Sequence, residues 1–243
     1  MSTALTPIDF NRLPSTQLGT DEQFDEFSRN AGFLGRLMLY SKNDAVAQGL
    51  IPPGTYGIPD GDKIIKLGPQ IDIIPLARRT KALNMNEPVI ANYDANSQQF
   101  KDIQALSMES NSKCMWGTSF LVFERSSARF LEFFPGSNTA RPRAGDIFPF
   151  LTLTQADIDR KKAAGADVSQ MKPHGPLPCT LKAEFVKSKK GFSWHLPEVH
   201  PCSVPFTNLP SQETINTEIE KFTHPTNDVE EVKEEPGKKA RAR

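Results

Sequence analysis

Residues 119–134 read SFLVFERSSARFLEFF, and this stretch decides the fold class. Two aromatic-rich runs flank the short polar segment 126–128. Because side chains alternate between the two faces of a strand, Phe123 and Arg125 are expected on one face and Phe120 on the other. The pattern predicts a β-hairpin whose strands carry aromatic rings together with arginine.

Further strands surround this hairpin in the sequence. A Pro-Asp-Gly turn at residues 59–61 predicts a second hairpin, because proline pre-sets φ and glycine accepts a positive φ. A third hairpin is expected around a turn at residues 188–191. Pro75 marks the expected strand 70–77 as an edge strand or a bend. The complete set of expected strands covers residues 32–40, 55–58, 63–67, 70–77, 89–93, 119–125, 129–134, 177–187 and 192–196.

Helices are few. Residues 96–107 repeat apolar side chains at three-residue spacing, which predicts an amphipathic helix. Thr154, with Asp157 three positions later, has the pattern of a helix cap, and Ser211 is expected to cap a last helix. The predicted fold class is mainly β with a few inserted helices, as a barrel or sandwich. The form we expect is an OB-like, partly open β-barrel.

The chain is expected to divide into three parts. Residues 1–30 form an N-terminal arm, and residues 31–224 form the β-rich OB-like domain. Residues 225–243 form a charged tail that is expected to be disordered. No aromatic residue follows Phe222, so the tail cannot bury enough apolar surface to offset the entropy lost on ordering.

The net charge of the chain is zero, with 29 basic and 29 acidic residues among 243. The whole molecule is therefore not a polycation. Lysine and arginine nevertheless outnumber aspartate and glutamate between residues 110 and 195. A locally basic region can bind an anionic polymer, because the local field governs the encounter. The alternative is an uneven distribution of charges on a solvated surface.

Cysteine content and hydropathy indicate the compartment. Three cysteines without framework spacing favour a reducing environment over a disulfide-stapled secreted fold. The N-terminus lacks the apolar segment of a signal peptide, and no apolar run approaches the roughly 20 residues of a membrane span. We expect a cytoplasmic protein with no membrane partner.

Aromatic and basic residues of the hairpins and neighbouring loops are the candidate binding residues. Bases of an unpaired strand stack on rings for about 1–3 kcal/mol each, and cations follow the phosphates. The candidates for stacking are Trp116, Phe123, Phe133, Phe192 and Trp194. The candidates for phosphate contacts are Arg78, Arg79, Lys81, Arg125, Arg129, Arg141, Arg143, Lys182, Lys187, Lys189 and Lys190. The alternatives are a ring in the core and a basic loop that serves solubility.

Catalytic templates are not found in the sequence. It has no GxxxxGK[ST] loop, no GxGxxG after a strand, no GxSxG elbow and no HExxH. His195, His200 and Cys202 are the only grouping that suggests a metal, and Pro197 and Pro201 break any helix that would align them. We expect no enzyme activity, no catalytic residue, no metal and no cofactor, and a metal-supported enzyme stays a third alternative.

Four segments carry a family resemblance: IPPGTYGIPD, IDIIPLARRTKAL, CMWGTSFLVFERSSARFLEFF and GFSWHLPEVHPCSVPF. Over residues 32–222 the chain resembles a group of phage and viral-metagenome proteins that keep these segments in this order. The architecture is also similar to that of phage single-stranded DNA-binding proteins of the OB-fold type. One departure is the tail, in which acidic residues are followed by the basic end KKARAR, whereas such proteins typically end in an acidic tip.

The resemblance implies a function in phage DNA replication or recombination. The expected activity is sequence-tolerant binding of single-stranded DNA in the host cell cytoplasm, by stacking and by counterion release, so that binding weakens steeply with salt. Single-stranded DNA is the expected partner, with replication proteins as further partners through the C-terminal tail. The alternative is a phage structural or assembly protein without a nucleic-acid role, in which the aromatic hairpins form core or subunit interface.

Overall fold

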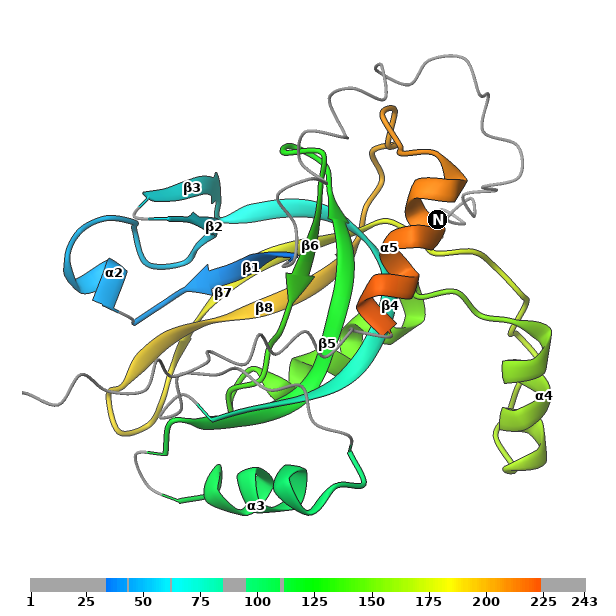
Figure 1. Ribbon diagram of the computed structural model, residues 1–243, viewed down its shortest axis with the longest axis horizontal. Helices are drawn as coiled ribbons and strands as arrows, with labels where there is room; N and C mark the ends of the chain where they lie inside the picture. The colour runs from blue at the N-terminus through cyan, green and yellow to red at the C-terminus, as the bar shows by residue number, and fades with distance from the viewer. Residues whose placement is uncertain (1–33, 43, 62, 85–94, 110–111, 224–243) are drawn as a thin grey trace, which may run out of the picture.

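The computed structural model describes residues 34–42, 44–61, 63–84, 95–109 and 112–223 (Figure 1). The expected N-terminal arm, the expected strand 89–93 and the expected charged tail lie outside the described residues.

Eight strands form one mixed sheet in the order β3-β2-β1-β6-β5-β4-β7-β8. Strands β1 and β6 run parallel, and all other neighbours are antiparallel. The strands are β1 (Gly35–Tyr40), β2 (Thr55–Asp60), β3 (Lys63–Gly68), β4 (Gln70–Asn84), β5 (Cys114–Glu124), β6 (Arg129–Phe133), β7 (Cys179–Lys187) and β8 (Ser193–Pro201). The prediction of a mainly β chain with a few helices is confirmed.

Strand β4 is much longer than expected and is not an edge strand. It pairs with β5 through Asn84 and with β7 only over its first residues, up to Ile73. Pro75 lies just beyond the part that β7 covers, and the register with β5 shifts between Pro75 and Ala77. Among the described strands, β4 has β5 as its one neighbour beyond Ile73, so no second strand requires the N–H that proline lacks. Pro75 therefore lies at a local edge of a strand that is internal in the sheet order, and the register shift beside it corresponds to the predicted bend.

The sheet curls until its two ends touch, but it is not closed by strand pairing. The backbone N–H of His195 on β8 donates to Ser41 Oγ after β1, at 2.8 Å. The Tyr56 hydroxyl on β2 donates to the carbonyl of Lys182 on β7, at 3.4 Å. Gly54 lies so close to the His195 ring that a Cβ at this position would come within 2.7 Å of it, and its φ of +75° also favours glycine.

The inner face of the curl holds the larger core. Tyr56 of β2, Phe120 of β5 and Leu181 of β7 are all fully buried there, although their strands are far apart in the sheet. A 3₁₀ helix, η2 (Arg141–Phe150), lies on this face and contributes Ile147 to the core. The sequence analysis placed the start of η2 in a loop; the helix was not predicted.

The outer face of the central strands is covered as well. Helix α5 (Gln212–Thr223) packs Ile215 and Phe222 on Leu121 and Phe123 of β5. Figure 1 shows α5 lying against the arched strands β4 and β5. The backbone N–H of Thr214 donates to Ser211 Oγ at 3.1 Å, so the predicted cap of this helix is confirmed.

Three shorter helices complete the described chain. Helix α3 (Gln98–Leu106) begins after a Ser97 cap, and α4 (Gln155–Ala163) begins with the capping box predicted for Thr154 and Asp157. Helix α2 (Asp44–Ala47) is a single turn. Among the described helices, none combines the length and the apolar character that crossing a membrane would require.

Candidate nucleic-acid interface

Two of the five predicted stacking rings are core residues. Phe123 is 2 % exposed and packs beneath α5, and Phe133 is 3 % exposed and packs inside the curl. A base needs an open ring face, so the prediction for these two residues is corrected. The reason is that both faces of the β5–β6 hairpin are covered, one by η2 and the other by α5.

Two predicted phosphate ligands belong to a buried ion-pair network. Lys81 Nζ lies 2.6 Å from Glu132 Oε2, and Arg79 Nη2 lies 3.0 Å from Glu132 Oε1, which also accepts from Ser119 Oγ. Burial raises the pKa of Glu132, but Lys81, Ser119 and Arg79 outweigh it and hold the pKa below its usual value. Arg79 also donates to the carbonyl of Phe222 and stacks on its ring. Lys81 is 4 % exposed and pairs with Glu132 of β6, while Arg79 joins Phe222 of α5 to the sheet, which corrects the prediction that these two residues contact phosphates.

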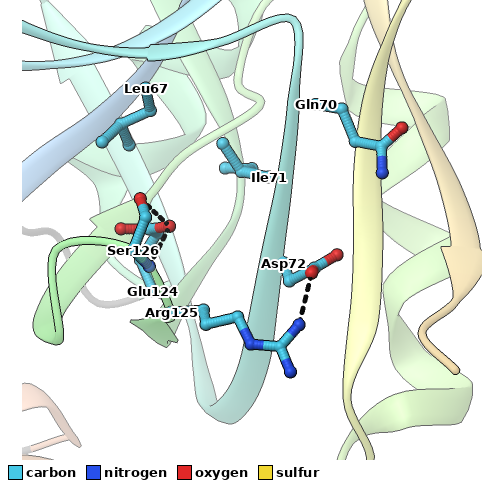
Figure 2. A pocket seen from close by; sticks show the side chains of 7 residues that line it. All are labelled: Leu67, Gln70, Ile71, Asp72, Glu124, Arg125 and Ser126. Carbon is cyan, nitrogen blue, oxygen red and sulfur yellow. Dashed lines mark hydrogen bonds and ion pairs between the residues drawn. The ribbon is translucent and has the colours of Figure 1, made fainter. Parts of the chain in front are cut away.

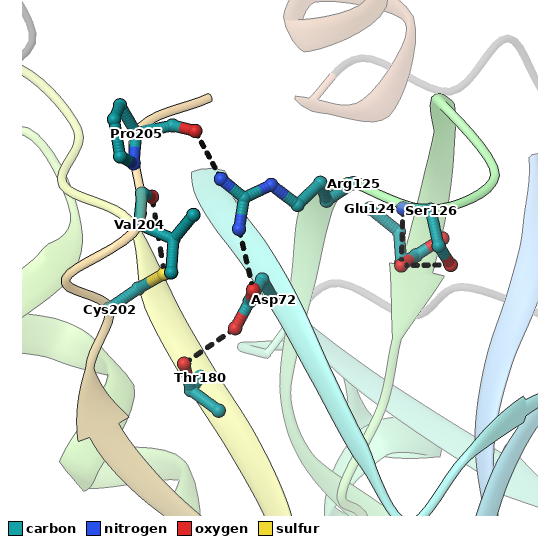
Figure 3. A network of polar contacts seen from close by, with 8 residues as sticks. All are labelled: Asp72, Glu124, Arg125, Ser126, Thr180, Cys202, Val204 and Pro205. Atoms are coloured by element: carbon teal, nitrogen blue, oxygen red, sulfur yellow. Dashed lines mark hydrogen bonds and ion pairs between the residues drawn. The ribbon is translucent and has the colours of Figure 1, made fainter. Parts of the chain in front are cut away.

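Arg125 is likewise committed to a structural network (Figure 3). Its Nη1 lies 2.7 Å from Asp72 Oδ2, and its Nη2 donates to the carbonyl of Pro205. Thr180 Oγ1 donates to the other oxygen of Asp72 at 2.6 Å, and the Arg125 guanidinium lies 4.7 Å from the centre of the Phe206 ring. The network joins β4, β7, the end of β5 and the segment before α5, which corrects the prediction of a phosphate contact.

A small pocket of about 140 Å³ lies beside this network, between β4 and the β5–β6 turn (Figure 2). Asp72 and Arg125 face each other across it. Glu124 accepts from the backbone N–H and hydroxyl groups of Ser126 and Ser127, so its carboxylate organises the turn. The Asp72–Arg125 ion pair and the serine hydrogen bonds of Glu124 engage the charged groups that line the pocket.

A second group of candidates lies along η2. Arg141, at its start, stacks on Trp116, with the guanidinium carbon 4.1 Å from the ring centre. The exposed Arg78 of β4 stacks on Phe148 near the other end of η2, at 4.4 Å. Arg143 pairs with Glu184 of β7 at 2.7 Å, so its charge is neutralised. The sequence analysis missed Phe148, because it did not predict the helix that brings this ring to Arg78.

The remaining open candidates gather at the end of the β7–β8 hairpin. Phe192 is 64 % exposed, and Phe185, which the sequence analysis missed, is 62 % exposed. Lys187, Lys189 and Lys190 lie between them in the sequence and are exposed. None of the three lysines forms an ion pair with a carboxylate of the described residues. We call these five residues the tip patch.

The turn that carries the tip patch is well defined. The backbone N–H of Ser188 donates to the carbonyl of Phe192 at 2.7 Å, and Ser188 Oγ accepts from the backbone N–H of Phe192 at 3.1 Å. Gly191 adopts a φ of +84°, which glycine accepts without strain. The predicted turn at 188–191 is confirmed. In Figure 1 the end of this hairpin lies on the opposite side of the molecule from α4.

The other three candidates lie away from the tip patch. Trp194 is half-buried and faces the side of the sheet opposite to Phe185, because it pairs with Val186 across the two strands. Lys182 is exposed but lies opposite Glu198. Arg129 lies on β6, which β5 and β4 separate from β7. Of the sixteen residues expected to bind nucleic acid, the structure thus brings Lys187, Lys189, Lys190 and Phe192 together in the open.

The residues considered for a metal are not assembled into a site. His195 and His200 are five positions apart on β8 and therefore lie on opposite faces of the sheet. In the part of the chain that the structure describes, no group of three or more His, Cys, Asp or Glu side chains could hold a metal ion.

Comparisons with known proteins give no match. No protein-family model matches this chain, and no curated protein or solved structure is significantly similar to it.

Proposed function

We propose that the protein binds single-stranded DNA without sequence preference through the tip patch, in phage replication or recombination in the cytoplasm of a host cell. The observation that carries the proposal is the exposure of Phe185 and Phe192 on either side of three lysines that pair with no carboxylate of the described residues. Of the two hairpins predicted to bind, the β7–β8 hairpin keeps its predicted role in this proposal, and the β5–β6 hairpin does not.

The chemistry of the tip patch favours an unpaired strand over a duplex. A base that stacks on an exposed phenylalanine must present a free face, which single-stranded DNA has and a duplex lacks. Lysine is a compact cation on a flexible stem, and it contacts phosphates without a fixed geometry. Such contacts are indifferent to sequence, because every base has a stacking face and every nucleotide has a phosphate.

The scaffold supports such a role by anchoring the base of the hairpin. Strand β7 pairs with β4, and Thr180 on β7 donates to Asp72 of the Arg125 network. The start of β8 is held through the His195–Ser41 hydrogen bond. A patch on a fixed hairpin loses little conformational entropy on binding. Within this proposal the curled sheet has the role of an OB-like barrel, because it presents a binding element on a packed core.

A binding assay tests the proposal directly. Fluorescence anisotropy with labelled oligo-dT is compared with a duplex of equal length, at low and at moderate salt. We expect binding to the single strand that weakens with salt, and weaker binding to the duplex. A variant with Lys161→Gln and Lys162→Gln, two exposed lysines of α4, is the control for net charge and is expected to keep the wild-type preference for the single strand.

Absence of binding at low salt would contradict the proposal and favour the second candidate, an assembly or structural protein of a phage particle. One observation supports that candidate: the exposed rings lie on a hairpin whose outer strand, β8, ends the sheet. Exposed apolar side chains at a sheet edge are also typical of protein–protein contacts. In that case we expect self-association that depends on Phe185 and Phe192.

A further inference from the structure

The Trp116 side chain contacts two others. The Phe100 ring of α3 meets it nearly at a right angle, with ring centres 6.2 Å apart. The guanidinium carbon of Arg141 lies over the ring, 4.1 Å from its centre. These contacts restrain the indole.

Two buried donors of this pair have no acceptor within the described part of the chain. Neither Trp116 Nε1 nor Arg141 Nη1 has a hydrogen-bond partner there, although both atoms are buried. Arg141 Nη2 is satisfied by Asn138 Oδ1 at 3.0 Å. Buried N–H groups in proteins are almost always paired, and an unpaired one is unfavourable. Two such groups on side chains in direct contact indicate that an acceptor belongs between or beside them.

The charge of Arg141 is also uncompensated. Arg79, Arg125 and Arg143 each contact a carboxylate, whereas among the described residues Arg141 contacts an amide oxygen and a ring. Loss of hydration lowers the pKa of Arg141, which is the effect expected of a cation without an anionic partner. The missing acceptor is therefore expected to carry negative charge.

We propose that Trp116 and Arg141 form a binding site for an oxyanion, specifically a phosphate group, whose oxygens accept from Trp116 Nε1 and Arg141 Nη1. A phosphate group presents several oxygens close together, so it can serve two donors on stacked planes at once. Both residues are only half-buried, so the rest of the ligand remains in solvent. Because both donor atoms are buried, phosphate binding is expected to displace the guanidinium from Asn138 and from the Trp116 ring far enough to open both donors.

This site is separate from the tip patch and does not depend on the proposed function. It is formed by β5 and the start of η2, whereas the tip patch belongs to β7 and β8. The phosphate group can come from a free anion or from the backbone of a nucleic acid. The two sources share one chemistry and are distinguished by the probe.

Tryptophan fluorescence reports on the site, because Trp116 and Trp194 are the two tryptophans of the chain. In a Trp194→Phe background the emission comes from Trp116. Inorganic phosphate is titrated at constant ionic strength maintained with sodium chloride. We expect a saturable change in emission, and a shift of the Trp116 indole N–H proton resonance in the otherwise unchanged protein. A change that does not saturate, or no shift of that resonance, would overturn the proposal.

Substitutions of Arg141 distinguish phosphate binding at this site from a general screening of the protein's charges by the added anion. Arg141→Gln should weaken phosphate binding about tenfold or more, which is the loss expected for one charge-assisted hydrogen bond. Arg141→Lys keeps the charge without the planar guanidinium, so its phosphate affinity should lie between those of the wild type and Arg141→Gln. Arg160→Gln, on the exposed face of α4, should leave phosphate binding unchanged. Equal phosphate affinity in the Arg141→Gln variant, with its unfolding midpoint retained, would refute the site.

A final titration identifies the source of the phosphate. Oligo-dT is added to the Trp194→Phe protein that also carries Phe185→Ala and Phe192→Ala. A saturable Trp116 response assigns the site to a nucleic-acid backbone, and a response to inorganic phosphate alone assigns it to a free anion. Both results support an oxyanion site. A lack of response to either probe contradicts it, whatever the tip patch does in the anisotropy assay.

Discussion

Two groups of cations in this molecule have opposite environments. On the sheet, Arg79 and Lys81 both contact Glu132, and Lys81 is buried with it. At the end of the β7–β8 hairpin, Lys187 and Lys189 stand in solvent and have no carboxylate of the described residues as a partner. The first group joins β4 to β6 and, through Arg79, to α5, while the second leaves its charge available. A basic residue near an aromatic one is therefore not in itself a sign of ligand binding. Whether a carboxylate pairs with the basic residue determines whether its charge is available to a ligand.

Removal of the buried carboxylate should have the largest effect on stability. Glu132→Ala leaves Lys81 buried without its anionic partner, and breaking a buried pair in this way typically costs about 3–5 kcal/mol. Urea unfolding measures the change in the free energy of unfolding. An effect below about 1 kcal/mol would mean that the network does not hold α5 to the sheet.

The Glu132 carboxylate should make the free energy of unfolding depend on pH in the acidic range. The folded-state pKa of Glu132 is lowered, so its contribution is fully present above the unfolded-state value of about 4.5 and is lost as pH falls through the folded-state value. The difference in unfolding free energy between the wild type and Glu132→Gln should therefore be constant near neutral pH and shrink below pH 4.5. A difference that grows in acid would contradict the lowered pKa.

Substitution of the exposed cations should leave the fold almost unchanged. Lys187→Gln, Lys189→Gln and Lys190→Gln together should change the free energy of unfolding by roughly 0.5 kcal/mol per site or less, because they remove no contact with a carboxylate. The slope of log affinity for oligo-dT against log salt should become shallower by about 2, at roughly 0.7 per phosphate contact. The matched control is the α4 variant with Lys161→Gln and Lys162→Gln, which should keep the wild-type slope.

Much of the secondary structure could be predicted because it depends on local signals. The Thr154 and Ser211 caps lie next to the amides they satisfy, and the glycine turns at Gly61 and Gly191 adopt the positive φ that the sequence indicates. The β1–β6 parallel pair depends on residues about a hundred positions apart, so no local pattern indicates it. Pro75 indicated an edge strand or a bend, but the sequence does not reveal that β4 has a second neighbour up to Ile73, so the edge is only local.

The candidate site could be predicted only in part. Alternation correctly separates Phe120 from Phe123 on β5, but it cannot show that η2 and α5 cover both faces. Lysine or arginine near an aromatic ring predicts a phosphate contact, but Lys81 is buried beside Glu132 of another strand, which the sequence does not indicate. The turn, the three lysines and Phe192 of the tip patch were predicted. Phe185 was not predicted, although it precedes the three lysines in the sequence as Phe192 follows them.

The most direct test of the central claim is the affinity of Phe185→Ala/Phe192→Ala for labelled oligo-dT relative to the wild type. Each lost stacking contact is worth about 1–3 kcal/mol, so we expect binding at least about tenfold weaker with an unchanged unfolding midpoint. Met108→Ala, which truncates another strongly exposed apolar side chain, is the matched control and should bind as the wild type does. Equal affinity of the double variant and the wild type would contradict the assignment of single-stranded DNA binding to the tip patch.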